Sequence, residues 1–309
     1  MWTQRCTHYP GNTLNPPRGR YSAGRQHQPM DIREFPAIDV HAHYGTYYRD
    51  GVSDLQNLMA SGDAETVVER AKRARTELTV VSPLLGLLPR GRADAAEGNR
   101  EAARIVPSTA GLLQWVVIDP NREETYEQAT QMLAEPHCVG IKLHPEEHCY
   151  PITQHGDKLF EFAAEHEAVV LVHSGDENSL PADFLPFAER YPEAKVILAH
   201  LGNGGGAAGD PTIQVRAIQA STKGNLYVDT SSARSILPRL VEWAVEQIGA
   251  ERVLYGTDTP LYQSEMQRAR INHAKLTDDQ KKLILRENAV RLLDLPQAPT
   301  TDSSGENDS

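Results

Sequence analysis

Two histidines, one residue apart, end the first clearly apolar run of the chain. The stretch AIDVHAHYG, residues 37–45, places His41 and His43 at strand spacing. Because side chains at positions i and i+2 of a strand lie on the same face, both imidazoles would project together and could hold one metal ion. Polar residues are also ordinary where a strand meets water. The pair alone therefore leaves a metal site and a solvated strand end both open.

Side chains of matching chemistry end later apolar runs. His173, His200 and Asp258 follow such runs in VLVHSG, VILAHLG and VLYGTDTP. Imidazole nitrogens and carboxylate oxygens are ligands of zinc and similar divalent metals. A catalytic zinc site keeps one position open for water and lowers the pKa of that water to about 7. The pattern therefore predicts a metal site that produces hydroxide at neutral pH.

Eight short runs rich in Val, Ile and Leu recur along the chain, and segments with helical patterns fill the gaps between them. These expected strands cover residues 37–41, 78–82, 112–118, 138–143, 168–172, 195–199, 225–228 and 252–255. They lack the polar alternation of half-exposed strands, which indicates parallel strands buried on both faces. Eight strand-helix units over about 260 residues predict a closed (β/α)8, or TIM, barrel, with a doubly wound open sheet as the alternative. In a barrel, the candidate metal ligands would all lie at the C-terminal ends of strands, where such folds carry their chemistry.

The composition of the chain divides it into a folded region and two tails. Residues 1–29 are rich in Pro, Gly, Asn, Gln and Arg, contain no Asp or Glu, and are expected to form a disordered arm. The barrel is expected over residues 30–295, and the polar segment 296–309 is expected to be a disordered tail. Met30 directly precedes the first recognisable element and is an alternative translation start.

Charge and cysteine content narrow the function classes. A formal net charge of −11 disfavours nucleic-acid binding, and no apolar stretch approaches the length of a membrane span. The N-terminus lacks the apolar segment of a secretory signal. Cys6, Cys138 and Cys149 form no CxxC pair, which suits a reducing compartment. We therefore expect a cytoplasmic protein that acts on a small molecule, with neither nucleic acid nor membrane as a partner.

Several motifs together resemble one known family. They are DVHAH, GIKLHP, VLVHSG, VILAHLG, NLYVDTS, VLYGTDTP and the closing ILRENAVRLLDL. From Ile38 to Leu295 the chain is similar to the amidohydrolase superfamily, in particular to its amidohydrolase-related branch of aminocarboxymuconate-semialdehyde-decarboxylase-like enzymes. The resemblance implies a metal-dependent enzyme on a distorted TIM barrel. The broader family often forms homodimers.

The resemblance also implies a role for each strand-end residue. It makes His41, His43, His173 and Asp258 the ligands of a metal, with one Zn²⁺ as the first expectation and another divalent ion or a binuclear site as alternatives. Asp258 would also accept the proton of the attacking water. His200 would stay off the metal in mononuclear members and orient or polarise the substrate or the water.

Lys142 and His144 have more than one expected role. In binuclear relatives a lysine of the fourth strand is carboxylated and bridges two metals, and Lys142 lies in the matching motif GIKLHP. His144 is the next inward position by strand parity. These two residues could bind a second metal ion. They could instead contact the substrate or form a buried ion pair. Asp39 is expected to support His41 or to form a hydrogen bond at the barrel floor, and Asp229 is expected to be structural.

Residues of the loops should form the rim of the site. Tyrosines suit recognition of a flat or cyclic small molecule, and arginines suit a substrate carboxylate. The candidates for substrate binding are Tyr44, Arg49 and Tyr262, with Arg90, Arg92 and Arg234 as further carboxylate anchors.

The expected function is hydrolysis of a small cyclic, ester-like or amide-like substrate by metal-activated water. A metal-dependent decarboxylase of an unsaturated or aromatic acid is the alternative, because it needs the same ligands. A barrel that binds a ligand without catalysis is the third hypothesis.

Overall fold

The computed structural model describes residues 31–232 and 236–296. The expected N-terminal arm, residues 1–29, lies outside the described residues, as do Arg234 and all but the first residue of the expected tail. No helix in the described part of the chain is long and apolar enough to span a membrane.

All eight expected strands are present and form one parallel sheet in sequential order. Most residues of each strand are buried, which is the pattern expected for parallel strands covered on both faces. The strands are β1 (Ala37–Tyr44), β2 (Thr76–Pro83), β3 (Leu112–Val117), β4 (Cys138–Leu143), β5 (Val169–Val172), β6 (Lys195–Leu198), β7 (Leu226–Asp229) and β8 (Val253–Leu254).

Hydrogen bonds between β1 and the segment after β8 close the sheet into a barrel. The Val40 amide donates to the carbonyl of Tyr255 at 3.0 Å, and the Asp258 amide donates to the carbonyl of His41 at 2.8 Å. The Asp39 carboxylate spans the same seam, because it accepts from the backbone amides of His41 and Thr257, each at 3.0 Å. The predicted TIM barrel is confirmed, and Asp39 holds the end of β1 beside the end of β8.

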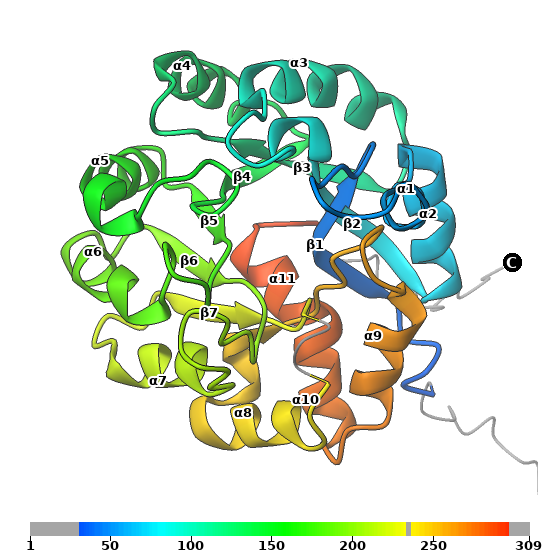
Figure 1. Ribbon diagram of the computed structural model, residues 1–309. Coiled ribbons are helices and arrows are strands. Elements are labelled where there is room, and N and C mark those ends of the chain that lie inside the picture. Colours follow the sequence, from blue (N-terminus) through cyan, green and yellow to red (C-terminus); the bar gives the residue numbers. More distant parts are fainter. Residues whose placement is uncertain (1–30, 233–235, 297–309) are drawn as a thin grey trace, which may run out of the picture. The chain divides into compact units, whose positions relative to one another are not determined.

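Helices surround the strands, and one helix lies at the centre of the ring when the barrel is viewed along its axis (Figure 1). The helices are α1 (Asp54–Met59), α2 (Ala64–Arg73), α3 (Ala95–Ile105), α4 (Glu123–Met132), α5 (Ile152–Glu165), α6 (Leu185–Arg190), α7 (Ile213–Ala220), α8 (Leu240–Ile248), α9 (Ser264–Asn272), α10 (Asp278–Lys282) and α11 (Asn288–Leu292). The central one is α11, which belongs to the closing motif of the sequence.

The floor of the barrel is made by α11. Ala289, Leu292 and Leu293 pack in one hydrophobic cluster with side chains of the strands, including the fully buried Trp115. The Asn288 side-chain amide anchors the helix by donating to the carbonyls of Ala250 at 2.7 Å and Val253 at 2.8 Å. The open end of the barrel is therefore the opposite one, where the strands terminate in polar side chains.

Candidate metal centre

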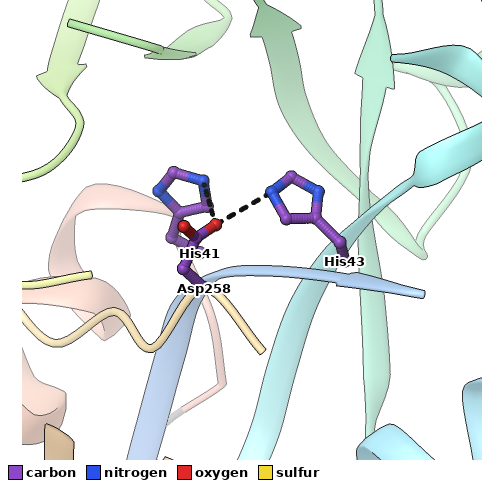
Figure 2. Close-up of side chains that lie close together, drawn as sticks. All are labelled: His41, His43 and Asp258. Atoms are coloured by element: carbon purple, nitrogen blue, oxygen red, sulfur yellow. Dashed lines mark ion pairs between the residues drawn. The ribbon is translucent and has the colours of Figure 1, made fainter. Parts of the chain in front are cut away.

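His41, His43 and Asp258 converge at the C-terminal end of the barrel, where the ends of β1 and β8 meet (Figure 2). One oxygen, Asp258 Oδ1, lies 3.1 Å from His43 Nε2 and 3.5 Å from His41 Nε2. All three side chains are buried, and their possible ligand atoms lie within 4.8 Å of one another. The structure thus brings together three of the four predicted metal ligands.

The ionisation of the Asp258 and His43 side chains suits a cation. Burial opposes ionisation of Asp258, but its hydrogen bond with His43 and the electrostatic influence of His41 outweigh burial and hold the pKa of the carboxyl well below its usual value. Burial also lowers the pKa of His43 to about 4, even though Asp258 opposes that shift. An ionised carboxylate and a neutral imidazole are the forms that bind divalent metals.

Hydrogen bonds behind the histidines orient both rings. His43 Nδ1 lies 3.2 Å from the carbonyl oxygen of Ser82 and 3.0 Å from its hydroxyl oxygen. His41 Nδ1 lies 2.8 Å from Asp229 Oδ2, which can only accept, so Nδ1 donates to it. The Nε2 of each ring faces Asp258. Metal-bound histidines usually have such a partner on their other nitrogen, so the arrangement fits a divalent cation.

Asp229 contributes more than the structural role expected for it. Burial raises its pKa, but the contact with His41 outweighs burial and keeps the pKa of this carboxyl below its ordinary range. His41, His200 and Asp229 also lie close enough to form a second metal-binding group. Because Asp229 Oδ2 already accepts from His41 Nδ1, we interpret Asp229 as the residue that orients His41.

Ser231 connects the same carboxylate to His200. Its Oγ lies 2.5 Å from Asp229 Oδ1 and 2.7 Å from His200 Nδ1. The ionised carboxylate can only accept, so the hydroxyl proton is donated to Asp229 and Oγ accepts from His200 Nδ1–H. Burial lowers the pKa of His200 well below its usual value. His200 is therefore neutral, with an unprotonated Nε2.

His173 lies beside the three-residue group and is not part of it. Its Nδ1 is 3.1 Å from His200 Nε2, and its Nε2 is 2.8 Å from Asp176 Oδ2. Its ring stacks on that of His144, with 4.3 Å between the ring centroids. Both ring nitrogens are engaged by neighbours other than the Asp258 carboxylate. The ligand role of His173 therefore stays a prediction.

Lys142 is fully buried below the histidines, and its Nζ lies 2.9 Å from His41 Nε2. Burial lowers the pKa of the amine from 10.5 to about 8, although Asp258 and Asp229 oppose the shift. The Lys142 amine thus forms a hydrogen bond with His41 Nε2, the nitrogen that would bind a cation. A cation at His41 would displace this hydrogen bond. The second-metal and substrate-contact roles of Lys142 stay predictions.

The lowered pKa of Lys142 should affect stability in alkaline solution. In the folded protein the pKa of Lys142 is about 8, below its ordinary value of 10.5. Between these pH values Lys142 therefore holds its proton in the unfolded chain and has lost it in the folded protein. In protein stripped of metal by a chelator, raising the pH through this window should therefore raise the free energy of unfolding, by about 3 kcal/mol from this group. Urea unfolding at a series of pH values measures this free energy. Lys142→Met should lose this rise, whereas Lys72→Met, at an exposed position on α2, should keep it. Equal pH profiles of Lys142→Met and the wild-type protein would contradict the assignment.

A cavity of about 490 Å³ lies over the three-residue group. Of the predicted substrate contacts, Arg49, Tyr262 and His144 line it, and so does Arg90. Tyr44 does not, contrary to expectation, because it packs with α2 and α3 residues such as Val67 and Ala102 in a separate hydrophobic cluster. The cavity is also lined by residues that the sequence did not single out: Glu146, Glu147, Asp176, Glu177, Asn203 and Ser232.

One expected arginine anchor, Arg92, is not among the residues that line this cavity. Arg92 forms an ion pair with Asp50 at 2.7 Å, in which both side chains are exposed. Arg234 lies outside the described residues. The sequence does offer a signal for two of the cavity-lining residues that were not predicted, since Glu146 and Glu147 directly follow the strand-end motif GIKLHP.

The barrel and the His/His/Asp group at its open end define a TIM-barrel enzyme with a site for a divalent metal. The chain belongs to the amidohydrolase family, whose sequence model matches residues 38–295. This confirms the resemblance found in the motifs. No curated protein matches the chain.

Solved structures with the same fold include several decarboxylases. The 5-carboxyvanillate decarboxylase from Sphingomonas paucimobilis is 13% identical, with a TM-score of 0.65 over 84% of this chain and 99% of that one. The 2,6-dihydroxybenzoate decarboxylase from Rhizobium is 13% identical, with a TM-score of 0.64 over 84% and 99% of the two chains. A dihydroxybenzoic acid decarboxylase from Polaromonas sp. JS666, solved with bound manganese and the inhibitor 2-nitroresorcinol, is 15% identical, with a TM-score of 0.63 over 85% and 98%. At these identities the likeness shows a common barrel.

Proposed function

We propose that the protein is a metal-dependent hydrolase of a small ester, lactone or cyclic amide. The observation that carries the proposal is the convergence of His41 Nε2, His43 Nε2 and Asp258 Oδ1 below a cavity large enough for a small molecule. We infer Zn²⁺ as the ion, since it favours two imidazoles and a carboxylate. Manganese, which the Polaromonas relative holds, is the alternative.

A divalent cation bound there would supply polarisation of a substrate carbonyl and a lowered pKa for a water molecule. The residues do the remaining work. Asp258 is ionised, so it can accept a proton from the water as the water oxygen bonds to the carbonyl carbon. His200, whose orientation is held by Ser231, lines the cavity, and its Nε2 can accept a hydrogen bond from the substrate in place of its contact with His173 Nδ1 at 3.1 Å. The leaving oxygen or nitrogen then takes up the proton from Asp258.

Decarboxylation of an aromatic or unsaturated acid is the second candidate. It is favoured by the names of the three solved relatives, all of which are decarboxylases. It would use the same ligands, with proton delivery to carbon in place of attack by water. The geometry of the three-residue group suits both reactions. The two reactions differ in whether an oxygen atom of water is incorporated into the product.

The test is a substrate panel in ¹⁸O-labelled water with protein loaded with zinc or manganese. The panel contains lactones, esters and cyclic amides on one side and hydroxybenzoates on the other. We expect turnover of an ester-like compound with one label in the product carboxylate. Release of CO₂ with no label in the remaining product would replace hydrolysis by decarboxylation. Binding without turnover of either class would support a non-catalytic barrel.

A further inference from the structure

Glu147 is a buried carboxylate in the loop after β4 that joins three loops at the cavity. Its side chain is 3% exposed. Arg90, from the loop after β2, places Nη2 at 3.0 Å from Glu147 Oε1 and Nε at 3.3 Å from Oε2. Arg49, from the loop after β1, pairs with Oε1 as well. Both carboxylate oxygens are therefore engaged by guanidinium groups.

These two arginines are the only Arg or Lys side chains among the described residues that line the cavity. Carboxylates outnumber them, because Glu146, Asp176, Glu177 and Asp258 line the same space in addition to Glu147. Apart from a metal ion held by the three-residue group, a substrate carboxylate would find its charged partner in a guanidinium of this set. A carboxylate that took the guanidinium nitrogens now paired with Glu147 would leave that buried charge under-satisfied.

We infer that Glu147 sets the charge specificity of the cavity by neutralising Arg49 and Arg90, so that neutral esters, lactones or amides are accepted in preference to carboxylates. The inference rests on the proposed function and deepens it, since it names the class of substrate. It also bears on the second candidate, because a decarboxylase must accept an anionic substrate at the same place.

Glu147→Gln tests this role by releasing both guanidiniums. The matched control is Glu177→Gln, which removes the same charge from the same cavity at an exposed residue that forms neither arginine pair. Binding of benzoate and of neutral benzamide to the zinc-loaded proteins is measured by calorimetry. In Glu147→Gln we expect about tenfold tighter benzoate binding, the scale of a charge-assisted hydrogen bond, with benzamide unchanged. In Glu177→Gln we expect less than about a threefold change for either probe, because a solvent-exposed charge is screened.

An equal increase in benzoate affinity in Glu177→Gln and in Glu147→Gln would show that the effect comes from the net charge of the cavity, and would overturn the inference. So would unchanged benzoate affinity in a folded Glu147→Gln protein. Adding Arg90→Gln to Glu147→Gln should remove most of the gain.

Single variants Arg49→Gln and Arg90→Gln test the inference without Glu147→Gln, should that protein fail to fold. With Glu147 present, each should leave benzoate binding within about threefold of the wild-type value, because the Glu147 carboxylate already offsets the positive charge of both guanidiniums. A loss of about tenfold or more in either variant would show that the arginines already serve anions, and would overturn the inference. Because these readouts need no turnover, a protein that hydrolyses nothing in the panel can still pass them.

Discussion

Replacing Asp258 by Asn should lower kcat/KM for the hydrolysed substrate by about 10³-fold or more. The amide has nearly the same shape but cannot accept the proton of the attacking water. It also removes the anionic oxygen that lies 3.1 Å from His43 Nε2 and 3.5 Å from His41 Nε2. Steady-state kinetics on metal-loaded protein gives the effect, and metal analysis of the same samples separates lost chemistry from a lost ion.

The matched control for this variant is Asp157→Asn. Asp157 is an exposed aspartate of α5 that pairs with Arg190 on the surface. Its replacement should change kcat/KM by less than about twofold, as is usual for surface substitutions. Retention of more than about a tenth of the wild-type kcat/KM in Asp258→Asn would exclude Asp258 as the proton acceptor.

Replacing His41 and His43 together by Ala should abolish stoichiometric metal binding. The wild-type protein should hold about one divalent ion per chain after dialysis, and the double variant close to none, because two of three converging ligands are removed. Inductively coupled plasma mass spectrometry gives the metal content, and circular dichroism checks that the barrel still forms. The effect tests the donor set directly, without any knowledge of the substrate.

His273→Ala provides the comparison for metal content. His273 is an exposed histidine at the C-terminal end of α9, and its replacement should leave the bound ion in place. Full retention of metal by the His41→Ala, His43→Ala protein would move the metal site elsewhere in the chain and remove the basis of the proposed hydrolysis.

Strand positions could be predicted closely because each strand contains a short run of Val, Ile or Leu and most of its residues are buried. The expected segments 138–143 and 195–199 coincide with β4 and β6 to within one residue. β8 is shorter than expected, since it was expected over 252–255 and is observed as Val253–Leu254. There the chain leaves the ladder after Leu254, and the Tyr255 carbonyl pairs with Val40 across the barrel seam. A hydrophobic pattern does not show where such a seam falls.

The grouping of His41, His43 and Asp258 could be predicted because barrel topology brings the first and last strands together. Tyr44 is expected at the rim from the sequence, yet strand alternation places it on the face opposite to His43, against the outer helices. Glu147 could not be paired with Arg49 in advance. The two residues lie 98 positions apart in different loops, and no periodicity relates one loop to another.

The helix that forms the barrel floor also sets an order of events during synthesis. Ala289, Leu292 and Leu293 complete a cluster that begins with Ile38, so its first and last members are separated by almost the whole described chain. Contacts of such long sequence separation form late. A nascent chain that has released all eight strands still has an apolar ring without its floor. We therefore expect the barrel to become resistant to proteases only after the segment with α11 has left the ribosome, and chaperones to bind the chain until then.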